Sequence, residues 1–280
     1  MLITTDTLIE GVHFDLGYMT LADVGYKALA VNMSDINAMG GECAAALGTL
    51  GVPKSATCED VEALLDGMAA ALQLCRHAGQ QCELVGGDTV AAPQWMIGFT
   101  ALGGVDGKPL LRSGGKPGDV VWHSGTLGLS GVGFEQLRRN GSTTTTAHAR
   151  PAPPLSLGPW LQRRGYATAA QDISDSLSQV ALQLADASGA GIELDFRGYG
   201  FAPEVVNYAD EARLESVAQA LLAQAEDYEL LFTTPPEFRE QIESSPVPCR
   251  PIGRLTEAGS SFFDEHGRRH ELRASGFEHL

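Results

Sequence analysis

The sequence predicts a two-domain protein of the α/β (α+β) class, with mixed sheets packed against helices. The chain has 280 residues, which favours two domains of about 100–150 residues each. Short apolar runs typical of strands and longer segments of helical periodicity occur in both halves. Residues 112–119 are rich in Gly and separate the halves, so the expected domains cover residues 1–115 and 116–280.

The first half is expected to contain two helices and three short strands. The expected ranges are residues 2–5 (strand), 21–39 (helix), 57–78 (helix), 84–85 (strand) and 95–102 (strand). Apolar residues recur at helical spacing in the helices, and short apolar runs mark the strands. The second helix has typical end signals, because Thr57 suits the N-cap, Asp60 the first turn and Gly79 the C-terminal stop.

The second half is expected to mix strands and helices in the same way. The expected strands cover residues 120–123, 191–195, 228–233 and 250–255. Residues 171–188 are expected to form an acidic turn followed by a helix, residues 203–224 to be mostly helical, and residues 237–244 to form a short helix. The first of these helices follows an acidic turn and stops at Gly189. Residues 141–154 are rich in Thr, Ala and Pro, and we expect a loop with little to pack.

The composition argues against several functional classes. A formal net charge of −16 disfavours a basic nucleic-acid-binding face, so we expect no nucleic-acid partner. No apolar run reaches the roughly 18 residues of a membrane helix and no secretory signal opens the chain, so we expect no membrane partner and a cytoplasmic location. The five cysteines lack CxxC spacing, which favours free cytosolic thiols.

Four short segments combine aspartate with hydroxyl residues or glycine. They are Thr4-Thr5-Asp6-Thr7, Asn32-Met33-Ser34-Asp35, Gly86-Gly87-Asp88-Thr89 and Asp172-Ile173-Ser174-Asp175. We expect the first and third at strand ends, the second just before small residues, and the fourth at a helix start. A cap or turn is the usual role of any one such aspartate. Four of them together also supply the ligands of a metal site.

Oxygen-rich segments of this kind suit a hard cation. Magnesium binds oxygen ligands and keeps several waters, so one or two carboxylates per ion suffice. Several ions could hold a polyphosphate against an acidic protein, because they separate the two sets of negative charge. The sequence lacks GxxxxGK[ST], a strand-linked GxGxxG and the protein-kinase signatures, so spacing alone leaves the substrate open.

Seven stretches, in order along nearly the whole chain, carry a family resemblance. They are TTDTLIEGVHFDL (from Thr4), YKALAVNMSDINAMGGECAAALGTLGVP (from Tyr26), ELVGGDTV (from Glu83), LRSGGKPGDVVWHSGTLG (from Leu111), QDISDSLSQVALQLADASGAGIELD (from Gln171), AEDYELLFT (from Ala225) and PIGRL (from Pro251). On these stretches the sequence resembles the thiamine-monophosphate kinases of the aminoimidazole ribonucleotide synthetase-like superfamily. The resemblance implies that superfamily's two-domain fold.

The resemblance also implies an enzyme that moves the γ-phosphoryl group of ATP onto thiamine monophosphate, giving thiamine diphosphate. It implies several Mg²⁺ ions, a homodimer with paired N-terminal sheets, and an active site between the two domains. The acceptor is an ionised phosphate oxygen, so no general base is required. We therefore expect direct in-line transfer without a phospho-enzyme, in which positioning and charge neutralisation carry most of the catalysis.

Position by position, the resemblance implies three sets of site residues. The implied metal ligands are Thr4, Thr5, Asp6, Asp35, Asp88, Asp172 and Asp175. The implied ATP contacts are Gly87, Asp88, Arg112 and Ser174. The implied substrate contacts are His13, Glu226 and Phe277. The planar guanidinium of Arg112 suits phosphate, and an aromatic face at Phe277 suits the cationic thiazolium ring.

The sequence departs from the family pattern at three places. The family's upstream Gly-Asp-Asp turn has no counterpart before Thr4, so we expect either a misassigned start or a short protein in which one ion loses a ligand. Ser176 and Gln224-Ala225 stand where the family has glycine, which allows close approach or positive φ.

These departures keep two alternatives open. One is a truncated, non-catalytic nucleotide-binding relative. The other is a superfamily member with a different substrate, such as a hydrogenase maturation factor or a selenophosphate synthetase. The maturation factor uses a C-terminal cysteine, and the synthetase uses a reactive cysteine or selenocysteine near its N-terminus. This chain ends in Leu280 and has no cysteine before Cys43, so the maturation factor and the synthetase are both disfavoured.

Overall fold

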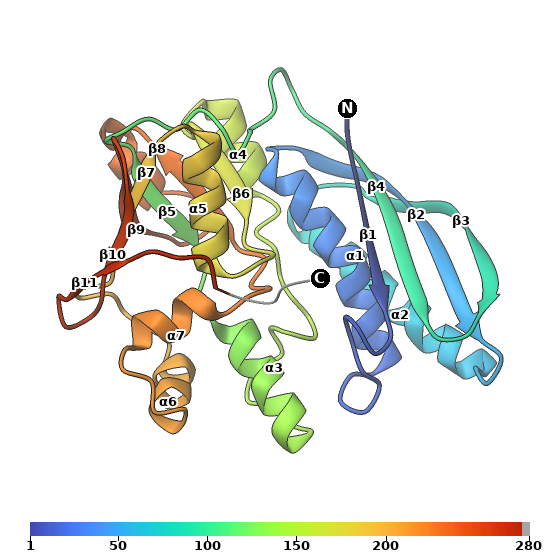
Figure 1. The fold of residues 1–280 in the computed structure, drawn as a ribbon. Helices are drawn as coiled ribbons and strands as arrows, with labels where there is room; N and C mark the ends of the chain where they lie inside the picture. Colours follow the sequence, from blue (N-terminus) through green and yellow to red (C-terminus); the bar gives the residue numbers. More distant parts are fainter. Residues whose placement is uncertain (276–280) are drawn as a thin grey trace.

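Two sheets packed with helices make up the molecule, which confirms the predicted α/β (α+β) class (Figure 1). The computed structural model describes residues 1–275 of the 280-residue chain. Within these residues, no helix combines the length and the apolar content that a bilayer span requires. The cytoplasmic location stays a prediction.

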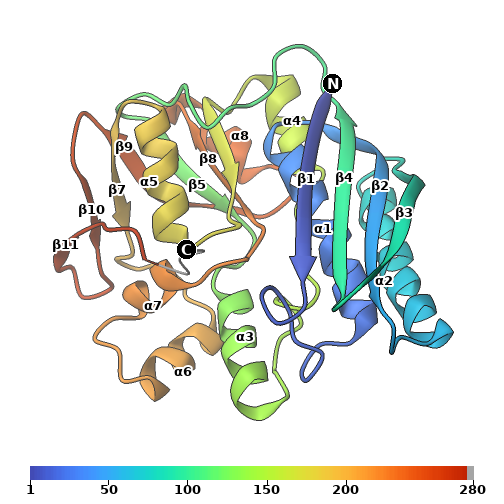
Figure 2. The same cartoon turned by 45° about the vertical axis from the view of Figure 1, so that its right-hand side comes forward.

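The N-terminal part is a four-stranded sheet with two helices on one face (Figure 2). Its elements are β1 (Leu2–Ile9), α1 (Leu21–Ala38), β2 (Glu42–Pro53), α2 (Cys58–His77), β3 (Glu83–Ala92) and β4 (Met96–Gly104). The strand order is β1-β4-β2-β3, with β2 and β3 parallel and the other pairs antiparallel. Phe99 and Ile97 of β4 pack in one buried cluster with residues of α1 and α2. On the other face, Ile3 and Leu47 are 58% and 42% exposed.

Helices α1 and α2 begin at threonine N-caps. The side chains of Thr20 and Thr57 each accept a hydrogen bond from the backbone N–H three residues further along the chain. The side chains of Asp23 and Asp60 accept the backbone N–H of Thr20 and Thr57 in turn, which completes a capping box at each helix. The predicted helix over residues 57–78 is confirmed, with Gly79 beyond its C-cap at φ 76°.

The C-terminal part is a seven-stranded sheet of order β11-β10-β7-β9-β5-β8-β6. Its elements are β5 (Val120–Ser124), α3 (Leu129–Asn140), α4 (Leu157–Arg164), β6 (Ala169–Asp172), α5 (Leu177–Ala187), β7 (Gly191–Asp195), α6 (Pro203–Glu211), α7 (Val217–Ala223), β8 (Leu230–Thr234), the 3-10 helix η1 (Pro236–Phe238), α8 (Arg239–Glu243), β9 (Cys249–Thr256), β10 (Ser260–Phe263) and β11 (Arg269–Glu271). Strands β7 and β10 are parallel, and the other pairs are antiparallel.

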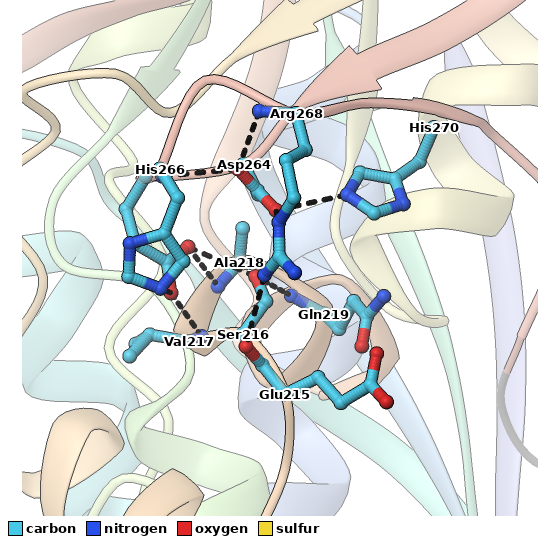
Figure 3. Close-up of polar contacts among 10 residues, drawn as sticks. Glu215, Ser216, Val217, Ala218, Gln219, Asp264, His266, Arg268 and His270 are labelled. Carbon is cyan, nitrogen blue, oxygen red and sulfur yellow. Dashed lines mark hydrogen bonds and ion pairs between the residues drawn. The ribbon is translucent and has the colours of Figure 1, made fainter.

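Hydrogen bonds link the loop between β10 and β11, at the edge of this sheet, to the start of α7 (Figure 3). Asp264 accepts two hydrogen bonds from Arg268, through its backbone N–H and its Nε, and contacts His270 Nε2 at 2.9 Å. Glu265 accepts the backbone N–H of Val217, in the first turn of α7, at 2.7 Å. The first N–H groups of a helix lack partners within it, so Glu265 caps α7 from outside the helix.

Helix α1 contacts both sheets and therefore positions one domain against the other. The chain returns from the C-terminal part to pack α4 on α1, where Gly158 N–H donates to Asn37 Oδ1 at 3.0 Å. A Cβ atom at Gly158 would lie 1.8 Å from the Asn37 carbonyl oxygen, so this close approach requires glycine. Leu110, in the connection between the sheets, donates its N–H to Met39 O at 3.0 Å.

Several elements differ from the sequence-based expectation. The strand over residues 42–53 was not predicted, because its alanines and glycines are poor strand formers. It forms because β4 and β3 pair with it on both sides. The structure also contains α3 and α4, which were not predicted. The segment 203–224 is mostly helical, as predicted, but it forms two helices, because the chain turns at Arg213 (φ 54°) between α6 and α7.

The predicted positions of the acidic segments are also partly wrong. Asp6 lies within β1 and Asp88 within β3, not at the ends of these strands, whereas Asp35 lies within α1, inside the helix predicted over residues 21–39. The structure has β3 continue through Gly86 and Gly87, because the parallel pairing with β2 extends over these residues. The segment after Asp172 does lead into a helix, but Ser176 is the N-cap of α5.

Candidate active site at the junction of the two domains

Three aspartates from separate segments come together where the two domains meet. Asp6 lies on β1, Asp35 on α1, and Asp172 at the end of β6. The hydroxyl of Ser34 donates to Asp172 Oδ2 at 2.8 Å, which links α1 to the C-terminal sheet. The hydroxyl of Thr4 donates to Asp35 Oδ2 at 2.5 Å. We call Asp6, Asp35 and Asp172 the acidic cluster.

The carboxyl groups of the acidic cluster resist ionisation. Burial and then the charge of Asp35 raise the pKa of Asp172 to about 7. The same two effects raise the pKa of Asp6 to about 6, although its side chain keeps contact with solvent. Carboxylates that the fold holds close together repel one another unless a cation neutralises them. Oxygen donors from carboxylates and hydroxyls are the ligands Mg²⁺ prefers, so the cluster fits that ion.

Three further predicted residues lie beside the acidic cluster. Arg112 lies within electrostatic range, because it counteracts the rise that burial causes in the pKa of Asp35. Asp175 lies three residues after Asp172 and accepts a hydrogen bond from Gln179 Nε2 at 3.1 Å. The Ser174 carbonyl accepts the backbone N–H of Glu226 at 3.2 Å, which ties the loop after β6 to the turn before β8.

Thr5 is the first predicted ligand whose side chain faces away from the acidic cluster. Asp6 is paired with Phe99, a core residue on the helix-covered face. Successive strand residues point to opposite faces, so the Thr5 side chain lies on the uncovered face. There its hydroxyl donates to the Phe99 carbonyl oxygen at 2.9 Å. The Thr5 hydroxyl therefore does not lie beside Asp6 within one chain, and its role as a metal ligand stays a prediction.

Asp88 is likewise separated from the acidic cluster. Across the sheet, Thr7 pairs with Gly98, Gly98 with Thr49, and Thr49 with Asp88, so Asp88 shares the uncovered face with Thr7. Three strand spacings, about 14 Å, separate β3 from β1. One chain therefore does not bring Asp88 into the cluster. Gly87 faces the helices, and a Cβ atom there would lie 2.0 Å from the Gly48 carbonyl oxygen.

The predicted substrate contact Glu226 lies in a second polar group at the same junction. Lys27 Nζ of α1 lies 3.1 Å from Glu226 Oε1, and His148 Nδ1 lies 3.3 Å from Glu226 Oε2. Burial opposes ionisation of Glu226, but Lys27 and then His148 outweigh it and lower its pKa. The charge of His13 acts on the carboxylate in the same direction, so His13 also lies nearby.

The predicted turn at His13 is built by local hydrogen bonds. His13 Nδ1 accepts the backbone N–H of Ile9 at 3.1 Å, which holds the ring against the turn after β1. The predicted contact Phe277 lies outside the described residues.

Tyr228 connects the two polar groups. Burial raises the pKa of its hydroxyl well above the ordinary value, and the charges of Glu226 and Asp172 add to the effect. The acidic cluster and the Glu226 group are therefore two ends of one polar region.

Sequence reasoning missed Lys27 and His148. A lysine in the otherwise apolar run YKALAV was an available signal, and the structure buries it completely. His148 lies in the segment 141–154, which we expected to have little to pack. That expectation is wrong, because the His148 side chain is 3% exposed and packs against Phe134 in a tilted arrangement, with ring centroids 5.0 Å apart.

The departures from the family's glycines cause no backbone strain here. Ser176 has φ −62° and caps α5, accepting the Gln179 N–H at 3.2 Å. Gln224 has φ −73°. The described non-glycine residues with positive φ are Arg213, Glu226 and Tyr228, so Ala225 adopts an ordinary conformation.

The fold and the site define an AIR synthase related protein. Residues 1–105 match the family described as AIR synthase related protein, N-terminal domain, and residues 116–265 match its C-terminal domain. The hydrogenase maturation protein HypE of Escherichia coli shares the fold alone, at 20% identity and a TM-score of 0.81 over 98% of this chain and 86% of that one.

Several relatives with higher sequence identity are thiamine-monophosphate kinases. The thiamine-monophosphate kinase of Aquifex aeolicus is 33% identical over 100% of this chain and 88% of its own length. The thiamine-monophosphate kinase of Haemophilus influenzae is 31% identical over 99% of this chain and 86% of its own length. That of Bacillus subtilis is 37% identical, but over 69% of this chain and 61% of its own length.

A comparison with solved structures leads to the same family. AaThiL complexed with AMPPCP and TMP superposes with a TM-score of 0.85, at 32% identity over 99% of this chain and 86% of that one. This chain belongs to the thiamine-monophosphate kinase family.

Proposed function

We propose that the protein transfers the γ-phosphoryl group of ATP to thiamine monophosphate, forming thiamine diphosphate. The convergence of Asp6, Asp35 and Asp172 at the domain junction carries the proposal, since two anionic phosphates can meet only where cations separate them. The relative solved with AMPPCP, an ATP analogue, and TMP supports the choice of substrates.

The side chains would act by holding and orienting the reactants. Asp6, Asp35, Asp172 and Asp175 would hold Mg²⁺, which supplies positive charge between the phosphates. Thr4 fixes the carboxylate of Asp35 and Ser34 fixes that of Asp172. Preset ligands need little rearrangement when charge develops in the transition state.

The remaining residues would place ATP and the acceptor. Arg112 would offer its guanidinium to phosphate, and Ser174 would border the nucleotide. Glu226 and His13 would contact thiamine monophosphate, where the ionised Glu226 carboxylate complements the cationic thiazolium ring. The acceptor oxygen is already ionised, so transfer is direct and in line. A chemical trap that captured labelled phosphoaspartate or phosphohistidine would contradict this step.

We further propose a homodimer built on the uncovered face of the four-stranded sheet. Ile3, Leu47 and Val90 of this sheet are 42–58% exposed, an unusual concentration of apolar side chains for a free surface. Asp88 lies on the same uncovered face. Pairing of two such sheets would therefore give Asp88, and with it Gly87, a role in a site that two subunits complete.

The test incubates purified protein with ATP, Mg²⁺ and thiamine monophosphate and follows thiamine diphosphate by chromatography. Formation of the product, lost on chelation of the metal, supports the proposal. Binding of ATP without product would favour the alternative, a non-catalytic nucleotide-binding relative. Turnover of ATP with a different acceptor would favour a superfamily member with another substrate.

A further inference from the structure

Three cysteines form a buried cluster in the N-terminal domain, apart from the candidate active site. Cys43 is the second residue of β2, Cys75 lies in the last turn of α2, and Cys82 directly precedes β3. Their Sγ atoms all lie within 4.8 Å of one another, and those of Cys43 and Cys82 are 3.1 Å apart. The three side chains are between 0% and 6% exposed. The fold thus gathers three thiols from three different elements at one point.

A fourth sulfur atom lies beside the cluster. Met33 Sδ of α1 lies 3.6 Å from Cys75 Sγ and is completely buried. Gln80 is adjacent, but its amide is engaged: Oε1 accepts the Cys43 N–H at 3.1 Å, and Nε2 donates to the Leu155 carbonyl at 2.7 Å. The cluster is therefore a soft, sulfur-only donor set within the apolar core.

We propose that Cys43, Cys75 and Cys82 bind one soft monovalent metal ion of the Cu(I) class, with Met33 as a weak additional ligand. Metal–sulfur bonds of about 2.3 Å place sulfurs around one ion about 4 Å apart. Small side-chain rotations convert the present spacing into that arrangement. Each coordinating thiol releases its proton to solvent, and the ion is neither oxidised nor reduced.

The donor set favours Cu(I) over Zn²⁺. Structural zinc sites take four good ligands, usually thiolates, imidazoles or carboxylates, whereas a thioether is a soft ligand suited to Cu(I).

An entry route lies beside the cluster. A surface cavity of about 510 Å³ reaches Cys43, and its lining includes the polar side chains of Gln80, Glu42 and Arg163. Binding would tie β2, α2 and the start of β3 together. We therefore expect the ion to stabilise the N-terminal domain, independently of the proposed kinase activity.

The test loads the reduced full chain with Cu(I) in the presence of a chromophoric Cu(I) chelator and measures bound copper per chain. We expect one Cu(I) per chain, a higher Tm on loading, and an X-ray absorption spectrum with a copper–sulfur shell near 2.3 Å. Bound copper should fall to near zero in Cys43→Ala and Cys82→Ala proteins. The matched controls Cys58→Ala and Cys249→Ala should bind like the unaltered protein.

Three results would overturn the proposal. The first is a copper–nitrogen or copper–oxygen shell in the unaltered protein, which needs no variant and no assumption about folding. The second is uptake of Zn²⁺ in preference to Cu(I). The third is a Cys43–Cys82 disulfide, found by mass spectrometry without reductant, that persists under the loading conditions and prevents uptake.

Discussion

Lys27 Nζ and Glu226 Oε1 lie 3.1 Å apart and form an ion pair that joins the two domains. Lys27 is completely buried on α1, and Glu226 lies in a left-handed turn at φ 63° just before β8. His148 approaches the second oxygen of the same carboxylate at 3.3 Å. A buried ammonium group needs its counter-charge, so this pair holds the carboxylate in one place at the junction.

Replacing Lys27 should therefore impair both stability and substrate binding. A Lys27→Met protein leaves the Glu226 carboxylate without its counter-charge, and we expect the free energy of unfolding to fall by about 3 kcal/mol. The KM for thiamine monophosphate should rise more than kcat falls. Urea denaturation and steady-state kinetics measure the two effects.

The paired variant Lys27→Met/Glu226→Gln separates charge from packing. It should regain most of the lost stability, because no unpaired charge remains, while the KM stays high. The surface pair Arg139–Glu135, whose arginine side chain is half exposed, provides a control, since Arg139→Met should change stability by no more than about 0.5 kcal/mol. Unchanged stability in the single Lys27→Met protein would contradict the role of the pair.

Neutralising Asp35 should have opposite effects on stability and on activity. In the metal-free protein, Asp35→Asn removes a carboxylate that raises the pKa of Asp6 and Asp172, so the Tm should rise. Turnover should fall by about a thousandfold or more, because a metal ligand is lost. Calorimetry without Mg²⁺ and product assays with Mg²⁺ test both, with exposed Asp106→Asn as the control. A lower Tm would count against mutual repulsion in the acidic cluster.

Asp88 offers a test of whether two subunits share a site. Asp88→Asn should abolish turnover and leave the fold intact, because the residue is exposed on β3. Mixing Asp88→Asn chains with Asp35→Asn chains should restore activity if Asp88 serves the partner subunit. Random pairing gives half heterodimers, each with one complete site, so about a quarter of full activity is expected. No recovery in proven heterodimers would show that Asp88 acts in its own chain or not at all.

His123 should make the protein more sensitive to acid. Its ring is buried between Tyr199 and the Ser124 carbonyl, and burial lowers its pKa from 6.5 to about 4. Between these values the unfolded chain takes up a proton that the folded chain does not. Stability from this residue is therefore complete above pH 6.5 and is lost as pH falls toward 4, by about 3 kcal/mol in total.

The measurement compares unfolding free energies of the unaltered and His123→Asn proteins at several pH values. The advantage of the histidine protein should shrink steadily between pH 6.5 and 4. A difference that stays constant over this range would show that His123 titrates alike in both states.

The cap of α7 should affect stability alone. Glu265 accepts hydrogen bonds from the N–H groups of Val217 and Ala218 and from the hydroxyl of Ser216. Glu265→Ala removes these bonds, and we expect a loss of about 1–2 kcal/mol in unfolding free energy with unchanged kcat and KM. The exposed Glu257→Ala serves as the control. A change in kcat or KM of the Glu265→Ala protein without a loss of unfolding free energy would instead show that Glu265 contributes to the active site.

The local sequence predicted much of the fold because the relevant signals are short-range. Thr57 and Gly79 mark the ends of α2, and the apolar runs mark β5, β7 and β9, since caps and periodicity act within a few residues. The strand over residues 42–53 was not predicted, because Ala and Gly have a weak preference for strands. It forms because it pairs with β4 on one side and β3 on the other, and this pairing outweighs the weak preference.

By itself, the sequence determined the fold class and which aspartates to examine. Only the tertiary structure decided which of them meet. Asp6 and Thr5 are neighbours in the chain yet point to opposite faces of β1, because strand side chains alternate. The register of four strands places Asp88 on the uncovered face, and α1 carries Asp35 and Lys27 to the C-terminal domain. Register and helix packing are long-range properties, so a local pattern cannot specify them.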